Sequence, residues 1–153
     1  MDFPGDSEWL ARHVGRLADS YARWTGRTLF PAVPAADLAR AAWTSPIILV
    51  SHGTEADPVL NFGNRAALML WEMSWQEFTR TPSRLTAEAP ERDERARLMA
   101  QVTAHGFIAN YAGVRISRSG RRFRIHSATV WNILDENEQA AGQAATFSDW
   151  QWV

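Results

Sequence analysis

The sequence contains no cysteine among its 153 residues and no lysine either. Without cysteine there can be no disulfide bond, thiolate metal site or cysteine nucleophile. Without lysine, all 16 basic residues are arginine, which excludes Schiff-base chemistry and lysine acid–base catalysis. A membrane-spanning run and a secretory signal are not expected, since apolar runs such as Ile47–Val50 are far too short to span a bilayer and the N-terminus lacks basic and apolar regions. We therefore expect a cytoplasmic protein with no membrane contact.

The charge of the chain is nearly balanced, with 16 basic and 17 acidic residues and a predicted pI of 6.4. Domains that bind nucleic acid usually carry a basic surface, so this composition does not favour a nucleic-acid partner. Apolar residues make up 46% of the chain, which fits one globular domain. The eight tryptophans predict either an aromatic core or a stacking surface for a planar ligand.

The segment 7–25 has the pattern of an amphipathic helix. Asp6 or Ser7 can cap its start, and Gly26 can end it in the left-handed conformation. Its apolar residues recur every three or four positions and are Trp9, Leu10, Val14, Leu17, Tyr21 and Trp24. This stripe must be buried against a sheet of the same chain or against a second copy. A homodimer through this helix or through the outer face of the sheet is therefore one predicted partner.

The remaining elements follow a recognisable order. We expect a short helix at 37–43, strands at 46–53 and 59–62, a helix capped by Asn64, and a capping box from Ser74 to Glu77. A further helix opens at Pro90 and ends at Gly106, and strands follow at 114–117, 122–134 and 142–152. Strands segregated from helices in this way predict an α+β fold with one antiparallel sheet.

Two segments resemble PAS domains: residues 59–68, where a strand runs into an asparagine-capped helix, and residues 142–149, which form the closing strand. Further blocks resemble the MEKHLA family, which is related to PAS domains; they are residues 51–55, 61–68, 71–78, 82–88, 115–125 and 128–132. The resemblance spans about residues 7–150. It implies a free-standing, bacterial-type member of a family also found at the end of plant homeodomain–leucine-zipper proteins.

The resemblance implies a PAS-like five-stranded antiparallel sheet, with short helices on one face and an N-terminal helix. We divide the chain into an N-terminal helical extension, 1–45, and a PAS-like MEKHLA domain, 46–153. The implied function is a non-catalytic sensory, ligand-binding or protein-interaction module. Because one fold hosts many functions, the ligand has to be argued from individual residues.

The best candidate for ligand contact is the segment Ser83-Arg84, which lies where PAS domains open their pocket. Arg84 could hold a carboxylate or phosphate in a forked geometry, or it could form an ion pair with Glu77 or Glu88. Gln143 could address a flavin edge or bond to its neighbours. We expect the aromatic side chains Trp71, Phe78 and Trp131 to line the same pocket.

The sequence leaves the cofactor unknown. The resemblance makes His105 a candidate haem ligand, although a histidine in the last turn of a helix also suits the helix dipole. A flavin bound reversibly is open, but the cysteine adduct of blue-light PAS domains is excluded. The four histidines have no metal-ligand spacing, so we expect no metal site.

Five arginines surround the predicted turn at Ser119-Gly120; they are Arg115, Arg118, Arg121, Arg122 and Arg124. They could grip an anionic ligand or partner, but strand alternation predicts that most of them lie on a solvated face.

Two other functions compete with the ligand-binding module. The first is a small α+β enzyme in which His52 acts as a general base with Glu55 or Asp57. The second is a scaffold with a filled core and no ligand. Strand order separates the module from the enzyme, because PAS domains place the first strand beside the last.

Overall fold

The computed structural model describes residues 2–153, apart from the side chains of 89–91. Its helices are α1 (Ser7–Thr25), α2 (Leu38–Thr44), α3 (Arg65–Trp71), α4 (Trp75–Phe78) and α5 (Ala89–His105), with 3₁₀ turns at Ala35–Asp37 and Ser83–Thr86. Its strands are β1 (Ile48–His52), β2 (Leu60–Gly63), β3 (Phe107–Ile116), β4 (Arg122–Leu134), β5 (Ala140–Phe147) and β6 (Trp150–Trp152). The backbone of α5 confirms the predicted helix that starts near Pro90.

All pairs in the sheet are antiparallel, and the main strand order is β2-β1-β5-β4-β3. The first strand therefore lies beside β5, as predicted for a PAS-like sheet. The expected single strand over 142–152 is wrong, because the chain breaks at Ser148-Asp149 into β5 and β6. β6 pairs with residues 123–125 of β4, whereas β5 pairs with residues 128–134.

A bulge changes the alternation within β4. Tyr111 pairs with Ala128 and Gly113 pairs with Ile125, so β4 advances three residues while β3 advances two. Phe123 and Ile125 and then Ala128 consequently belong to one buried cluster on the same side of the sheet. Without this extra residue, the two halves of β4 would present their apolar side chains to opposite faces.

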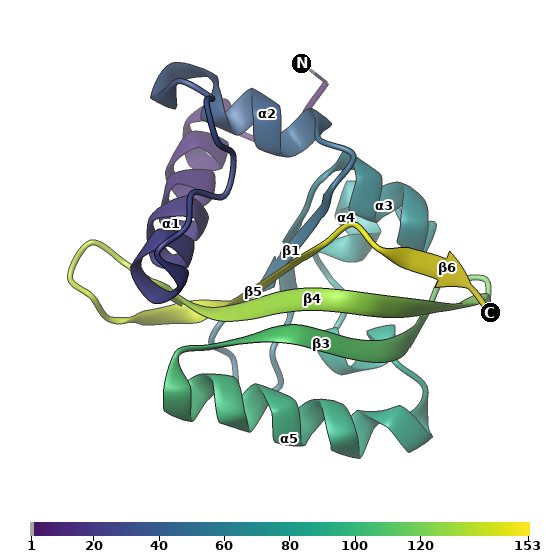
Figure 1. The fold of residues 1–153 in the computed structure, drawn as a ribbon. Coiled ribbons are helices and arrows are strands. Elements are labelled where there is room, and N and C mark those ends of the chain that lie inside the picture. Colours follow the sequence, from purple (N-terminus) through teal and green to yellow (C-terminus); the bar gives the residue numbers. More distant parts are fainter. Residues whose placement is uncertain (1) are drawn as a thin grey trace.

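The sheet carries helices on both faces, and Figure 1 shows α1 and α5 on opposite sides of β3, β4 and β5. Asp6 caps α1 by accepting from the Glu8 amide, and Gly26 ends it with φ of 71°. The apolar stripe of α1 packs in one cluster with Leu49, Phe62 and Trp131. The stripe is therefore buried against the sheet of its own chain, on the face that we call the outer face.

Hydrogen bonds fix α1 to β4 as well. The indole of Trp131 donates to the Leu17 carbonyl at 3.2 Å, and the indole of Trp24 donates to the Asn132 carbonyl at 2.9 Å. The Leu134 amide donates to Ser20 Oγ at 2.8 Å. Because these contacts and the apolar cluster join α1 to the sheet, the helix shares a core with the strands that follow residue 45. The division of the chain at residue 45 stays a prediction.

A polar chain is buried between α1 and the sheet. His13 Nε2 lies 2.8 Å from Ser51 Oγ, which donates to Asn61 Oδ1 at 2.5 Å. The His13 ring stacks on Trp9 with centroids 4.7 Å apart and is 8% exposed. Burial, together with the positive charge of Arg16, lowers the pKa of His13 to about 4. His13 is therefore neutral at pH 7 in the folded protein.

Acid is expected to weaken the fold through His13. In the unfolded chain its pKa is about 6.5, so between pH 6.5 and 4 the unfolded state binds the extra proton and stability falls as pH falls. At pH 4 the free energy of unfolding should be about 3 kcal/mol lower than at pH 7, because the pKa of His13 is about 6.5 in the unfolded chain and about 4 in the folded one. Urea unfolding at pH 7 and pH 4 would measure it. His13→Gln should show a smaller loss than the native protein, and identical losses would contradict this role.

Candidate functional site: a cavity beneath the sheet

A cavity of about 70 Å³ lies between α3, α4 and α5 and the sheet face opposite α1, which we call the inner face. Its apolar wall includes Val50, Leu60, Ile125, Val130 and Phe147. Polar side chains reach the same space from β1, β3, β5, α5 and the turn at 83–86. The cavity is therefore an apolar space with a few inward polar groups, which is the usual composition of a small-molecule site.

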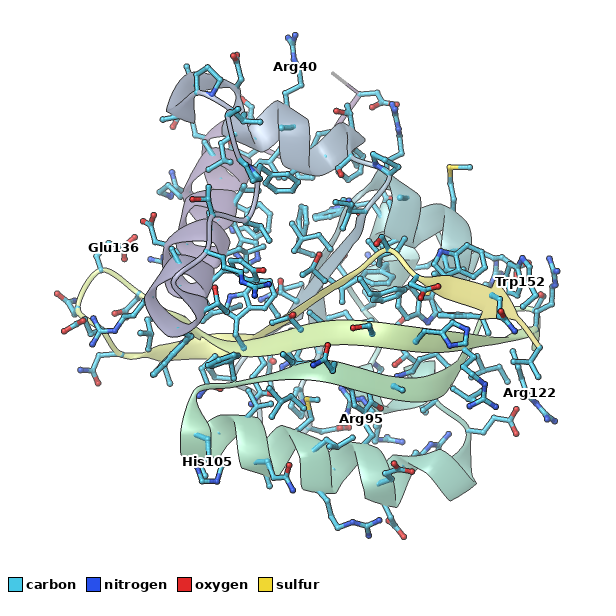
Figure 2. The ribbon with its side chains drawn as sticks, viewed as in Figure 1. Arg40, Arg95, His105, Arg122, Glu136 and Trp152 are labelled. Atoms are coloured by element: carbon cyan, nitrogen blue, oxygen red, sulfur yellow. The ribbon has the colours of Figure 1, made fainter. Side chains whose placement is uncertain are left out.

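Arg95 enters this cavity from α5, and Figure 2 shows it between that helix and β3. Its guanidinium donates to the hydroxyl of the buried Ser83. Burial lowers the pKa of Arg95 to about 10, and the positive charge of Arg115 acts in the same direction. Arg95 is therefore still charged at neutral pH.

Arg115 enters the same cavity from β3 and is 6% exposed. Its strand partner is Phe123, which belongs to the buried inner cluster. The prediction of a solvated face is therefore wrong for Arg115, although Arg118 and Arg122 are exposed and form ion pairs with Glu77 and Glu88. Val114 and Ile116 are only partly buried, so the apolar alternation did not mark the inner face here.

Tyr111 and Gly113 hold Arg115 in place. Arg115 donates to the Tyr111 hydroxyl at 2.6 Å and to the Val114 carbonyl at 2.9 Å. A Cβ atom added to Gly113 would lie 2.6 Å from that hydroxyl. Glycine at this position thus leaves room for the two longer side chains to meet above it.

Gln143 forms a polar network in the middle of β5. Its amide nitrogen lies 3.0–3.2 Å from three acceptors, the Met99 carbonyl, Thr103 Oγ1 and Asn132 Oδ1, which share its two hydrogens. Its amide oxygen has no hydrogen-bond partner among the described residues, and the same is true of Trp71 Nε1. Both residues line the cavity, at 7% and 3% exposure. Two residues of the cavity wall therefore each carry a buried polar atom without a described partner, one an acceptor and the other a donor.

His52 also lines the cavity, but it lacks the carboxylate that the enzyme hypothesis requires. Its Nδ1 lies 3.0 Å from the Gly53 carbonyl, and burial lowers its pKa. Glu55 instead accepts from the Val59 amide, and Asp57 pairs with Arg84. Among the described residues, no hydrogen bond joins His52 to Glu55 or Asp57, so the predicted His–carboxylate pair is not formed.

The structure brings four of the six predicted ligand residues together, since Ser83, Trp71, Phe78 and Gln143 line the cavity. Arg84 and Trp131 do not line it. The side chain of Arg84 is 49% exposed and pairs with Asp57, not with Glu77 or Glu88 as considered above. Trp131 points to the outer face, where it packs under α1. The candidate haem ligand His105 is exposed at the far end of α5 (Figure 2).

Sequence reasoning missed Arg95 and Tyr111, and it named Arg115 only within a cluster of arginines that could bind an anion but was expected to be mostly solvated. The sequence does contain a signal for the contact between Tyr111 and Arg115. These two residues lie on one face of a strand, and the glycine between them, Gly113, leaves room for two long side chains. Arg95 had no such signal, since α5 carries arginine at several neighbouring positions.

The comparisons with known proteins agree with this geometry. The sequence profile of the MEKHLA domain matches residues 11–152. The chain belongs to the MEKHLA family. It is 29% identical over its whole length to homeobox-leucine zipper protein ATHB-9 of Arabidopsis thaliana, and 28% identical over 94% of the chain to ATHB-14 of that plant. The chain spans only about a fifth of the length of each of these relatives, at 19% and 17%.

Solved structures similar to this MEKHLA domain are PAS-like. They include a PAS domain from Colwellia psychrerythraea, with a TM-score of 0.62, 14% identity, and coverage of 75% of this chain and 92% of that one. An RNA-binding light-oxygen-voltage receptor has a TM-score of 0.61 at 14% identity, and the match covers 80% of this chain and 35% of the receptor chain. A PAS domain of a LuxR-family regulator from Burkholderia thailandensis, in complex with ethanol, gives 0.54 at 19% identity, covering 70% and 92%. These likenesses confirm the PAS-like fold.

The predicted MEKHLA family and the predicted PAS-like fold are therefore both confirmed. Across the described part of this MEKHLA domain, the helices are too short or too polar to cross a membrane.

Proposed function

We propose that this MEKHLA domain is a sensory module that holds a small ligand in the cavity beneath its sheet. The observation that carries the proposal is that two residues lining the apolar cavity, Trp71 and Gln143, each keep a buried polar atom, Nε1 and Oε1, without a described partner. A buried polar group without a partner costs about 1–3 kcal/mol. A ligand that bonds to either atom recovers part of that free energy, so the cavity favours a polar guest.

The volume of the cavity limits the ligand to a few non-hydrogen atoms. At about 70 Å³ it is far smaller than sites for drug-sized ligands, which start near 300 Å³. Ethanol, the molecule bound by the Burkholderia thailandensis PAS domain, is of suitable size. A flavin or haem would require the walls to move apart, so neither is proposed as the cofactor.

Strand β1 offers a route by which occupancy could reach the outer face. Val50, Ser51 and His52 all line the cavity, and the hydroxyl of Ser51 also bonds to His13 on α1. A ligand that shifts β1 would change the docking of α1, and the population of docked helix would then report binding. In this proposal, α1 and the outer sheet face form the surface that passes the signal on, and the predicted homodimer would form through that surface.

A substitution that fills the cavity should block the ligand. Ala145→Val adds two methyl groups to the cavity wall and is expected to weaken binding of ethanol, acetate or acetamide, whichever binds the native protein, by at least tenfold. Ligand titrations followed by ¹H–¹⁵N NMR would monitor the Trp71 indole, which is assigned by its disappearance in Trp71→Phe. Ala112→Val, an identical change at an exposed position of β3, is the matched control.

Two results would contradict the proposal. One is a panel in which no probe shifts the Trp71 indole. The other is a probe whose affinity is the same in Ala145→Val and in the native protein, because such a probe would bind outside the cavity.

A further inference from the structure

The described lining of the cavity is unbalanced in charge. Arg95 and Arg115 both face it, and no aspartate or glutamate is among its described lining residues. The described ion pairs of the protein also leave these two arginines out, since they join Arg16, Arg23, Arg65, Arg84, Arg118 and Arg122 to carboxylates. The six arginines with a described carboxylate partner thus lie outside the cavity, whereas the two inside it face neutral groups.

Such an arrangement is costly unless an anion joins it. Removing a cation from water costs several kcal/mol, and two like charges in one apolar space repel each other. Neutral oxygens meet some of the donors, because Arg95 donates to Ser83, and Arg115 donates to Tyr111 and Val114. Each guanidinium has five N–H donors, so both keep donors for a further acceptor.

We propose that the ligand of the cavity is a small carboxylate, held between the guanidinium groups of Arg95 and Arg115. This inference rests on the proposed function, whose ligand it assigns to a chemical class. The planar fork of arginine matches the two oxygens of a carboxylate. The volume of about 70 Å³ restricts the rest of the molecule to a short apolar chain, such as that of acetate or propionate, against Val130 and Phe147.

Tyr111 and Ser83 act as positioning residues for this site. Each accepts from one of the two arginines and so fixes the direction of its fork. Both are buried, and Gly113 leaves the space in which Tyr111 reaches Arg115. The two guanidinium groups therefore have defined places before a ligand arrives, which limits the ordering that binding requires.

The test compares charged and neutral probes of the same shape on the native protein. Acetate and propionate are titrated against acetamide and propionamide in buffer free of chloride, sulfate and other carboxylates, with the Trp71 indole as the NMR reporter. We expect the carboxylates to bind at least tenfold more tightly than the amides. Chloride is titrated separately and is expected to bind more weakly than propionate.

Variants then assign the charge to its residues. Arg95→Met and Arg115→Met are each expected to weaken propionate binding by 10- to 100-fold, the loss of a charge-assisted hydrogen bond or pair of bonds. Arg97→Met, an exposed change on the same helix, and Arg84→Met, at the exposed ion pair with Asp57, should leave binding unchanged.

Three other results would contradict the inference. If amides bind as tightly as carboxylates and Ala145→Val blocks them, the cavity is still a ligand site, but its ligand is not specifically a carboxylate. Chloride that binds as tightly as propionate would overturn it in favour of a simple anion site. If no probe shifts the Trp71 indole, the proposed function fails together with the inference. The native comparison decides between these results even if an arginine variant does not fold.

Discussion

Asn64→Ala is expected to lower the free energy of unfolding by about 4 kcal/mol, a large share of the 5–15 kcal/mol that stabilises a typical domain. Asn64 is fully buried. Its side-chain oxygen accepts from the amides of Leu49 and Ala67, at 3.2 and 3.1 Å. Its nitrogen donates to the carbonyls of Ala42 and Ile47, at 3.0 and 2.7 Å. One side chain thus caps α3 and joins it to α2 and β1.

Alanine would leave these backbone groups unpartnered, and each costs about 1–3 kcal/mol when buried. Urea unfolding followed by circular dichroism measures the loss, and the melting temperature should fall by roughly 10 °C. Asn137→Ala, in the exposed turn between β4 and β5, is the matched control and should change stability by less than about 0.5 kcal/mol. A loss below about 1 kcal/mol for Asn64→Ala would show that water or relaxed backbone replaces these bonds.

Gly142→Ala is expected to cost about 3–4 kcal/mol and to abolish binding in the cavity. Gly142 has φ of 122°, and a Cβ atom there would lie 2.0 Å from the backbone oxygen of His52. Because that oxygen belongs to β1, the contact can be relieved only by parting β1 from β5. The partners at this point are His52 and Gln143, which both line the cavity. The substitution therefore disturbs the fold and the site together.

Gly120→Ala separates the two causes of this loss. Gly120 has φ of 91°, but a Cβ atom there meets nothing within 4 Å. Its replacement should cost only the strain of the left-handed backbone, about 1–2 kcal/mol. Thermal unfolding of both variants, with propionate titrations on the folded protein, measures the difference. Equal losses in the two variants would mean that the clash with His52 is relieved without parting the strands.

Much of the local structure follows from residues that act on their immediate neighbours. Asp6 caps α1, and Ser74 and Glu77 form the expected capping box at α4. Gly106 ends α5 in a conformation that other residues rarely adopt. These signals depend on contacts across three or four residues, so they can be found without knowing what else surrounds them. The resemblance to PAS and MEKHLA sequences then supplied the order of the sheet.

The division of side chains between the two faces followed the pattern only in part. For 128–134 the alternation holds, with Trp131 under α1 and Val130 over the cavity. At the bulge in β4 the alternation shifts by one residue. In β3 the alternation does not predict the inner face, because Val114 and Ile116 are only partly buried while Arg115 points inward. A bulge is a property of two paired strands, so neither strand predicts it alone.

By itself, the sequence determined the helices and their caps, the α+β class, the family, and the absence of cysteine and lysine chemistry. Only the tertiary structure decided that Arg95 and Arg115 share a cavity while Arg84 pairs with Asp57 at the surface. The physical reason is distance along the chain. A cap is made by neighbours, but the charge of a cavity is the sum over side chains from β1, β3, β5 and α5, which meet only when the sheet closes over the helix.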